Sequence, residues 1–514
     1  MFLRQREPLI FERSVPGKRG MDLPRLDVPE ARDTRPAHLQ RSGFEALPEL
    51  SEVDVIRHFT RLSKWNYGVD DGIYPLGSCT MKHNPRLNEK VALLPGFTDS
   101  HPMAPDALVQ GNLELVYTLQ EWLKEITGLP GVTLQPSAGA SGELTGVMLI
   151  RAYHLSKGAK RRVILIPDSG HGTNPATAAM AGYDVVELPS QPDGTISFED
   201  VTDPTSGKVR KGLLSLVAEL GPEIAGAMIT NPNTVGVFEY RFKEISDLLH
   251  SIGALVYMDG ANMNALIGVA RPGDFGVDVM HLNLHKTFST PHGGGGPGAG
   301  PVCCAEQLRP FLPVPVVVRE TRSVGEGERP AHAYHWDWDR PQSIGKVHTF
   351  YGNFGILVRA LTYCLSHGSD GLKAATLRAI VNANYIRVRL QGAYALHIDS
   401  PSLHEVVFSD TLQAKHDVHT LDIAKRLIDH GYHPPTIYFP LIVPGAMMIE
   451  PTESEDKFEL DAFCDTMLTI AREAEKIPEA LHHAPILAPL RRLDETTAAR
   501  KPVLRWQKPV AVQA

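Results

Sequence analysis

The stretch ALVYMDGANMNALIGVARPGDFGVDVMHLNLHKTF, residues 254–288, decides the fold class of this chain. It contains two runs of strand length, and each leads to a residue that can take part in chemistry, Asp259 after the first and Lys286 after the second. Val277 and Val279 alternate with polar neighbours, which is typical of extended chain. Ligands of open α/β sheets bind at the carboxyl ends of strands. The stretch therefore predicts two strands that deliver an acid and an amine to one site.

Strand-length apolar runs alternate with helical segments on the N-terminal side of this stretch. The runs include RVILIP, DVVELP and IAGAMIT, and the helical segments include GELTGVMLIRAYHLS and FKEISDLLHSIG. Such alternation is the signature of βαβ units around a parallel sheet. Residues 111–127 add an amphipathic helix that ends at Gly128. We therefore expect an α/β fold, with a large domain built on a mostly parallel sheet over residues 105–369.

The rest of the chain divides into three further regions. Residues 1–104 are expected to form an N-terminal arm and a helical segment, because residues 1–50 are rich in Arg, Pro and Asp and lack periodicity. Helical and strand segments recur over residues 370–490, which predicts a smaller α+β C-terminal domain. Residues 491–514 form a basic tail. An extended arm implies a partner surface on which it lies.

Composition excludes several classes of protein. The 51 basic and 59 acidic residues give a net charge of −8, so no basic field gathers nucleic acid. The longest strongly apolar stretch, residues 441–449, is too short to cross a membrane. Five scattered cysteines favour a reducing compartment. The basic start contains Glu7 and Glu12 and lacks the apolar core of a secretory signal, and its acids also disfavour a mitochondrial transit peptide. We expect a cytoplasmic protein.

Two motifs suggest functions that their context disfavours. His281 and His285 are four residues apart, as zinc ligands on a helix would be, but the strand-rich context argues for extended chain, and we expect no metal. Residues 293–298, GGGGPG, satisfy the pattern GxGxxG, yet Pro297 lacks a backbone donor and Pro301 follows before a helix can form. The run is interpreted as a turn beside a site, and not as a dinucleotide fingerprint.

The candidate site residues follow the ends of strands. Asp259 is partly desolvated in that position and needs a cation or a strong donor. Desolvation lowers the pKa of an amine such as Lys286 and makes it a nucleophile, although a lone lysine is more often a surface residue. Residues 137–142, SAGASG, can hold a phosphate at a helix N-terminus through backbone N–H groups and the Ser137 and Ser141 hydroxyls. A small-residue helix start is an equally good explanation of that segment.

Together with His171, which follows RVILIP, these residues are what pyridoxal 5′-phosphate needs. The lysine forms a Schiff base, the aspartate keeps the pyridine nitrogen protonated, and the imidazole lies over the ring. The order resembles the aspartate aminotransferase superfamily of fold type I enzymes. That resemblance implies the catalytic residues Lys286, His171 and Asp259, and further cofactor contacts from Gly139, Ala140, Ser141, Thr230, Ala261 and His285.

A closer resemblance is carried by blocks spread along most of the chain. HLNLHKTFSTPHGGGGPG at 281–298 is similar to the lysine segment of the glycine cleavage system P-protein family, the decarboxylating glycine dehydrogenases. Other similar blocks are YPLGSCTMKHNP at 74–85, FYGNFGILVRA at 350–360, YFPLIVPGAMMIEPTES at 438–454 and RLDETTAARKPVLRW at 492–506. His83 departs from the family, where a tyrosine is expected. The chain has the length of one half of the long form, and it resembles the separate second subunit.

The resemblance implies an activity and partners. Glycine would be decarboxylated with pyridoxal phosphate, and the aminomethyl group would pass to the lipoyl arm of the H-protein, so no nicotinamide is needed. Subunit 1 would complete a heterotetramer of two dimers. Residues 78–85 and 293–298 are candidates to line a lipoyl channel, Cys79 is either a channel thiol or a small packing residue, and Arg359 is one candidate for the glycine carboxylate. Another fold type I enzyme, such as a desulfurase or class V aminotransferase, and a silent scaffold half are the alternatives.

Overall fold

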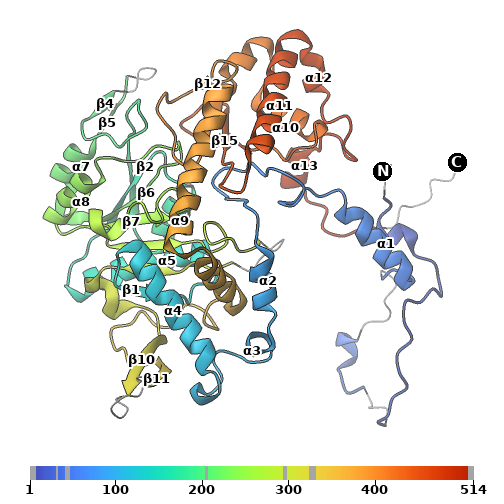
Figure 1. The fold of residues 1–514 in the computed structure, drawn as a ribbon, viewed down its shortest axis with the longest axis horizontal. Helices are drawn as coiled ribbons and strands as arrows, with labels where there is room; N and C mark the ends of the chain where they lie inside the picture. The colour runs from blue at the N-terminus through green and yellow to red at the C-terminus, as the bar shows by residue number, and fades with distance from the viewer. Residues whose placement is uncertain are drawn as a thin grey trace.

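The computed structural model describes residues 7–29, 33–40, 47–202, 207–292, 298–322 and 331–507 (Figure 1). None of the helices in these ranges has both the length and the apolar character needed to pass through a bilayer.

The regular elements of the described ranges are as follows. The α-helices are α1 (Glu52–Ser63), α2 (Arg86–Ala92), α3 (Pro95–Thr98), α4 (Gln110–Thr127), α5 (Gly139–Ser156), α6 (Thr173–Met180), α7 (Leu213–Leu220), α8 (Phe242–Ser251), α9 (Phe354–Leu390), α10 (Thr420–Asp429), α11 (Lys457–Lys476), α12 (Pro478–His482) and α13 (Glu495–Arg500). The strands are β1 (Gly131–Thr133), β2 (Val163–Pro167), β3 (Asp184–Leu188), β4 (Val201–Thr202), β5 (Val209–Arg210), β6 (Ile224–Thr230), β7 (Leu255–Gly260), β8 (Val279–Leu282), β9 (Val302–Cys304), β10 (Val316–Arg322), β11 (Ala331–Asp337), β12 (Ala395–Leu396), β13 (Val406–Ser409), β14 (Thr436–Ile437) and β15 (Ala446–Ile449). Short 3₁₀ turns are η1 (Ile10–Arg13), η2 (Ala37–Leu39), η3 (Asp106–Leu108), η4 (Gly221–Glu223), η5 (Pro272–Phe275), η6 (Glu306–Phe311) and η7 (Asp410–His416).

The central sheet has seven strands in the order β1-β9-β8-β7-β6-β2-β3. Neighbouring strands from β8 to β3 pair in parallel, and β9 runs antiparallel to both β1 and β8. The expected α/β fold with a mostly parallel sheet is confirmed. Because crossover helices cover a parallel sheet on both faces, its central strands β6 and β7 are buried along nearly their whole length.

Alternate residues of each strand pack into two separate cores. Leu255 and Tyr257 of β7 belong to the core that α5 covers, whereas Val256 and Met258 belong to the core that includes α4 and α8. Side chains of a strand point alternately to its two faces, so an uninterrupted apolar run such as ALVYM serves both cores. The sheet is therefore fixed from both sides, and its strand ends are rigid supports for a site.

A second sheet and its helices form a smaller unit in the C-terminal part of the chain (Figure 1). Its strands have the antiparallel order β12-β13-β15-β14, and α10 and α11 share a core with them. The long helix α9 joins this unit to the large one and bends at Gly368, which has φ 62°. The expected boundary between residues 369 and 370 thus falls inside α9. Ile73 lies in the core of the smaller unit, and Leu76 forms a β-bridge with Ile449.

The described parts of the N-terminal arm extend away from the rest of the chain beside the C-terminal tail (Figure 1). Before α1 the arm contains only the turns η1 and η2. The rings of Phe11 and Trp506 stack with centroids 5.0 Å apart, so arm and tail support each other. Met21 and Leu23 are 74% and 85% exposed. The arm therefore presents apolar side chains that none of the described residues covers.

Three local predictions from the sequence are confirmed. The helix expected over residues 111–127 is α4, and Gly128 ends it in the left-handed conformation with φ 71°. Cys303 and Cys304 lie on β9 and are buried packing residues, and all five cysteines are unpaired. His281 lies on β8, which confirms extended chain there.

Candidate active site

The site lies at the carboxyl ends of neighbouring parallel strands of the central sheet. Thr230 of β6 is the register partner of Asp259 of β7, and Asp259 is the register partner of His281 of β8. Three polar side chains thus stand side by side where the strands end. Lys286 follows β8 in the loop that leaves the sheet at the same edge.

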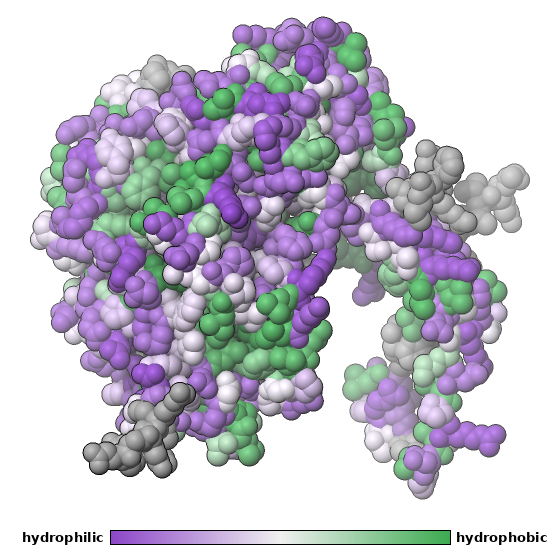
Figure 2. All heavy atoms as spheres, viewed as in Figure 1, coloured by the Kyte–Doolittle hydropathy of each residue, from purple (hydrophilic) through white to green (hydrophobic). Residues whose placement is uncertain are grey.

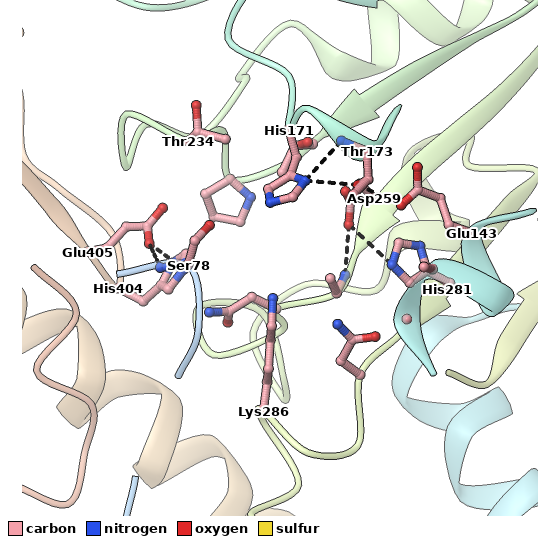
Figure 3. A pocket seen from close by; sticks show the side chains of 17 residues that line it. Ser78, Glu143, His171, Thr173, Thr234, Asp259, His281, Lys286, His404 and Glu405 are labelled. Atoms are coloured by element: carbon pink, nitrogen blue, oxygen red, sulfur yellow. Dashed lines mark hydrogen bonds and ion pairs between the residues drawn. The ribbon is translucent and has the colours of Figure 1, made fainter. Parts of the chain in front are cut away.

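A cavity of about 150 Å³ opens at this edge, and the side chains around it are shown in Figure 3. It is lined by Ser78, Gly139, Ala140, Glu143, His171, Thr173, Thr230, Pro232, Thr234, Asp259, Ala261, Asn262, His281, Asn283, Lys286, His404 and Glu405. Of the cofactor contacts expected from the sequence, Ser137, Ser141 and His285 do not line it. The others come from five separate segments and meet around one space.

Lys286 is half-buried and its side chain lines the cavity, with the amine between Asp259 on one side and Glu405 on the other (Figure 3). Its backbone is held in a turn, because its N–H donates to the carbonyl of Asn283 at 3.0 Å and its carbonyl accepts from Ser289. The alternative of a lysine on the outer surface is therefore excluded.

Asp259 is fully buried in an environment that favours its carboxylate. Burial by itself raises the pKa of this carboxyl, but His281, the hydrogen bond from Asn174, the Ala261 N–H and Lys286 together outweigh it and lower the pKa. The Asn174 amide donates at 3.1 Å and the Ala261 N–H at 3.0 Å. An ionised carboxylate without a guanidinium partner is suited to hold a proton on a heterocyclic nitrogen.

His171 is tied to a buried acid through one hydroxyl. Its Nδ1 lies 2.8 Å from Oγ1 of Thr173, and that hydroxyl donates to Glu143 at 2.9 Å. The imidazole also packs edge-on against Phe439, with centroids 5.6 Å apart. Because Thr173 holds Nδ1 and Phe439 packs against the ring, the imidazole is oriented at the cavity by residues of this chain.

The N-terminus of α5 lies at the cavity, where the sequence predicts that residues 137–142 hold a phosphate. Gly139 and Ala140 line the cavity, and N–H groups of a first helical turn have no partner within the helix. The Ser141 hydroxyl is used locally, because it donates to the Ala138 carbonyl at 2.9 Å. A Cβ on Gly139 would meet Oδ1 of Asn283 at 2.4 Å, so only glycine fits there.

His285 lies behind the lysine beside another imidazole. Its Nδ1 accepts from the Ala299 N–H at 3.5 Å, and its ring centroid is 5.2 Å from that of His292. Burial, His292 and Lys286 lower the pKa of His285 to about 4. The imidazole is therefore neutral near pH 7 and can act only as a hydrogen-bonding group.

Several residues of the site could not be predicted from the strand pattern of the central sheet. Ser78 comes from the N-terminal segment, and His404 and Glu405 come from the smaller unit just before β13. His281 and Glu143 lie within expected elements, but nothing in their neighbours distinguishes them from core residues. Only the position of Glu143 one turn into the small-residue helix start could have drawn attention to it.

The residues present fit pyridoxal 5′-phosphate. Oγ1 of Thr230 and Oδ1 of Asn283 are buried and have no hydrogen-bond partner within the described ranges. Both residues line the cavity beside Asp259, so polar atoms are available there for a heterocyclic ligand. Thr230, Asp259, Lys286 and the cradle at Gly139 offer donors and acceptors for the ring hydroxyl, ring nitrogen, aldehyde and phosphate respectively.

Two other expectations concern residues away from this cavity. Arg359 forms a bidentate pair with Glu89, with both nitrogen–oxygen distances 2.8 Å, and it does not line the cavity. Cys79 is half-buried, and burial raises the pKa of its thiol. Residues 293–297 of the expected channel lie outside the described residues.

Comparison with known proteins identifies the family. The family "Glycine cleavage system P-protein" matches residues 22–327, and "Glycine dehydrogenase, C-terminal domain" matches residues 375–486. A protein of Caldanaerobacter subterraneus subsp. tengcongensis, named probable glycine dehydrogenase (decarboxylating) subunit 2, is 53% identical over 98% of this chain and 100% of its own. Proteins of the same name from Listeria welshimeri and Bacillus licheniformis are also 53% identical, over 99% and 98% of this chain and 100% and 99% of their own.

Solved structures agree on the fold. A glycine decarboxylase (P-protein) of the glycine cleavage system, in inhibitor-bound form, has a TM-score of 0.66 at 18% identity and covers 84% of this chain and 92% of its own. The glutamate decarboxylase of Lactobacillus brevis has a TM-score of 0.60 at 14% identity over 89% of this chain and 96% of its own. The resemblance found in the sequence is confirmed: this chain belongs to the glycine cleavage system P-protein family.

Proposed function

We propose that this chain is the lysine-bearing subunit of a glycine decarboxylase, which releases carbon dioxide from glycine and passes the aminomethyl group to the lipoyl arm of an H-protein. The observation that carries the proposal is the meeting of Lys286 and Asp259 in one cavity with a helix N-terminus. The names of the full-length relatives support the reaction and its assignment to glycine. The name "subunit 2" implies a partner subunit.

Bound pyridoxal phosphate would supply the ring that accepts the electron pair left behind by carbon dioxide. Lys286 would hold the cofactor aldehyde through Nζ. Asp259 keeps a proton on the ring nitrogen, because its own carboxyl stays ionised. His171, which lines the cavity, would orient the bound ring, while the first N–H groups of α5 would hold the phosphate. Each of these roles uses a group that the fold positions beforehand.

The proposed partners are subunit 1 in a heterotetramer, and a lipoylated H-protein. The arm supports the first of these, because its exposed apolar side chains need a covering surface (Figure 2). We also propose a cytoplasmic location, which the five unpaired cysteines support.

The test is exchange of labelled carbon dioxide into glycine by the holoenzyme with subunit 1, in the presence and absence of lipoylated H-protein. In the wild type we expect exchange that depends on H-protein and the yellow colour of the bound cofactor. Lys286→Ala should lose both the exchange and the colour. Lys415→Ala, an exposed lysine of the smaller unit, is the matched control and should change neither. A coloured wild type that releases sulfur from cysteine, and exchanges nothing with glycine, would refute the proposal in favour of a desulfurase.

A further inference from the structure

Two buried acids of the smaller unit lie together at the edge of the cavity. Glu405 precedes β13 and Glu450 follows β15, and these strands pair with Val406 opposite Ile449. One ligand atom each of His404, Glu405 and Glu450 lie within 4.8 Å of one another. Of the two acids, only Glu405 lines the cavity. Like charges this close cannot both form without a large electrostatic penalty.

The hydrogen bonds of the two carboxyl groups are unequal. Oε1 of Glu450 accepts from Oγ1 of Thr80 at 2.7 Å, Nδ2 of Asn262 at 2.9 Å and Nδ2 of Asn264 at 2.8 Å. Its Oε2 accepts from the Thr80 N–H at 3.2 Å. Glu405 receives a single donor within the described ranges, the Ser78 N–H at 3.1 Å. Because donors stabilise a carboxylate, the negative charge belongs on Glu450 and the proton on Glu405.

The electrostatics of the surrounding groups agree with this assignment. Burial and the charge of Glu450 raise the pKa of Glu405 well above its usual range, and the Ser78 N–H and Lys286 do not offset them. His404 lies 3.8 Å from Glu405, and burial lowers the pKa of its imidazole, so it provides no cation there.

The cavity also lacks the group that most often binds a substrate carboxylate. Among the described residues that line it there is no arginine, and Arg359 is paired with Glu89 elsewhere. Glu143 and Asp259 already place acidic groups on the side of the cavity opposite Glu405 (Figure 3). An ionised Glu405 would repel a substrate carboxylate, whereas a protonated Glu405 offers it an O–H donor.

We propose that Glu405 in its protonated form donates a hydrogen bond to the carboxylate of the substrate amino acid, in place of an arginine. The inference rests on the proposed function and names a residue that recognises its substrate. During the reaction the carboxylate leaves as carbon dioxide, the electrons of the broken carbon–carbon bond stay on the substrate carbon, and Glu405 keeps its proton. A neutral donor suits this step, because a fixed cation would stabilise the carboxylate more than the neutral product that it becomes.

The first experiment compares ligands with and without a carboxylate. Glycine and methylamine are titrated into the holoenzyme with subunit 1, and dissociation constants are taken from the change in cofactor absorbance. We expect Glu405→Ala to raise the dissociation constant for glycine at least about tenfold and that for methylamine by less than about twofold. Glu405→Gln, which keeps a neutral donor and an acceptor for the Ser78 N–H, should stay within about threefold of the wild type for both ligands.

The second experiment observes the proton directly and does not require the alanine variant to fold. The infrared spectrum of the wild type should contain the C=O band of a protonated carboxyl that is missing in Glu405→Gln. Glu475→Gln, an exposed acid of α11, is the matched control and should leave that band in place.

The outcomes separate this inference from the proposed function. A wild type whose cofactor spectrum does not respond to glycine contradicts the proposed function. A wild type that responds, combined with Glu405→Ala that binds glycine normally or loses glycine and methylamine equally, overturns only the role of Glu405. If the wild-type and Glu405→Gln spectra show no difference at the C=O band of a protonated carboxyl, the role of Glu405 is overturned as well.

Discussion

Asp259 and His281 face each other across β7 and β8, with Nε2 of His281 3.6 Å from Oδ1 of Asp259. The other ring nitrogen, Nδ1, lies 2.6 Å from the hydroxyl of Tyr257, so the imidazole is fixed between a phenol and a carboxylate. His281, the Asn174 amide, the Ala261 N–H and Lys286 together lower the pKa of Asp259 and favour its ionised form. A charge held this way remains available to a ligand.

Asp259→Asn tests that charge. The amide cannot hold a proton on the ring nitrogen, so we expect kcat to fall by about 100- to 1,000-fold. The cofactor should also bind more weakly, which equilibrium titration with pyridoxal phosphate measures. Asp184→Asn, an exposed acid of β3, is the control. Unchanged turnover in Asp259→Asn would show that the carboxylate does not serve the ring.

Thr173→Val tests the link between His171 and Glu143. The substitution keeps the shape of the side chain and removes the hydroxyl that bonds to both residues. We expect kcat to fall about tenfold because the imidazole loses its fixed orientation, with the cofactor absorbance maximum shifted. Thr202→Val on β4 is the control and should leave both kcat and the absorbance maximum unchanged. An equal activity in both variants would make the hydroxyl dispensable.

Lys82 tests how the N-terminal segment is held between the two units. Its buried amine lies 2.7 Å from Glu453 and 3.1 Å from the Tyr363 hydroxyl. Burial lowers the pKa of this amine, but Glu453 and Tyr363 outweigh it, so the pKa is raised above 10.5. We expect Lys82→Met to lose about 3 kcal/mol of stability in denaturant unfolding, because Glu453 is left unpaired.

The sign of the pH dependence follows from the raised pKa. The contribution of Lys82 is fully present below pH 10.5 and is lost as the pH rises through the folded value. The double variant Lys82→Met/Glu453→Gln should recover part of the loss, because no unpaired charge remains. Additive effects of the two substitutions would contradict the pairing.

The lowered pKa of His285 predicts that the folded chain loses stability at acidic pH. Its pKa is lowered to about 4 in the folded chain from 6.5. Its contribution is therefore fully present above pH 6.5 and declines as the pH falls toward 4, since only the unfolded chain then takes up a proton. The difference amounts to at most about 3 kcal/mol. The free energy of unfolding of the wild type and of His285→Asn, measured at neutral and acidic pH, tests this contribution. The same pH dependence in both proteins would disprove it.

Substitutions in the N-terminal arm should weaken the binding of subunit 1 without changing any catalytic residue. Met21, Leu23 and Leu26 are 74%, 85% and 72% exposed. Changing all three to Ser should raise the dissociation constant for subunit 1 at least about tenfold, because buried anchor residues supply most of the affinity of an interface. Light scattering and titration of the two subunits measure this. Met180→Ser, an exposed residue of α6, is the control.

The sequence was most informative where a pattern is local. Strand runs such as ALVYM and RVILIP, the helix that ends at Gly128, and the acid and amine that follow two strands could all be recognised, because side-chain periodicity and glycine punctuation act over a few residues. The family resemblance came from contiguous blocks such as residues 281–298, which extend along most of the chain.

Three-dimensional contacts decided the rest of the site. Ser78 and Glu405 are 327 positions apart, yet the Ser78 N–H donates to Glu405, because residues 73–82 pack between the two units. The sequence offers Arg359 as a candidate for the substrate carboxylate, but the fold pairs its guanidinium with Glu89. Sequence alone determined which strands form and which chemical groups end them. Tertiary structure decided which acid is ionised, because that depends on donors and burial contributed by distant segments, and a linear pattern carries no record of either.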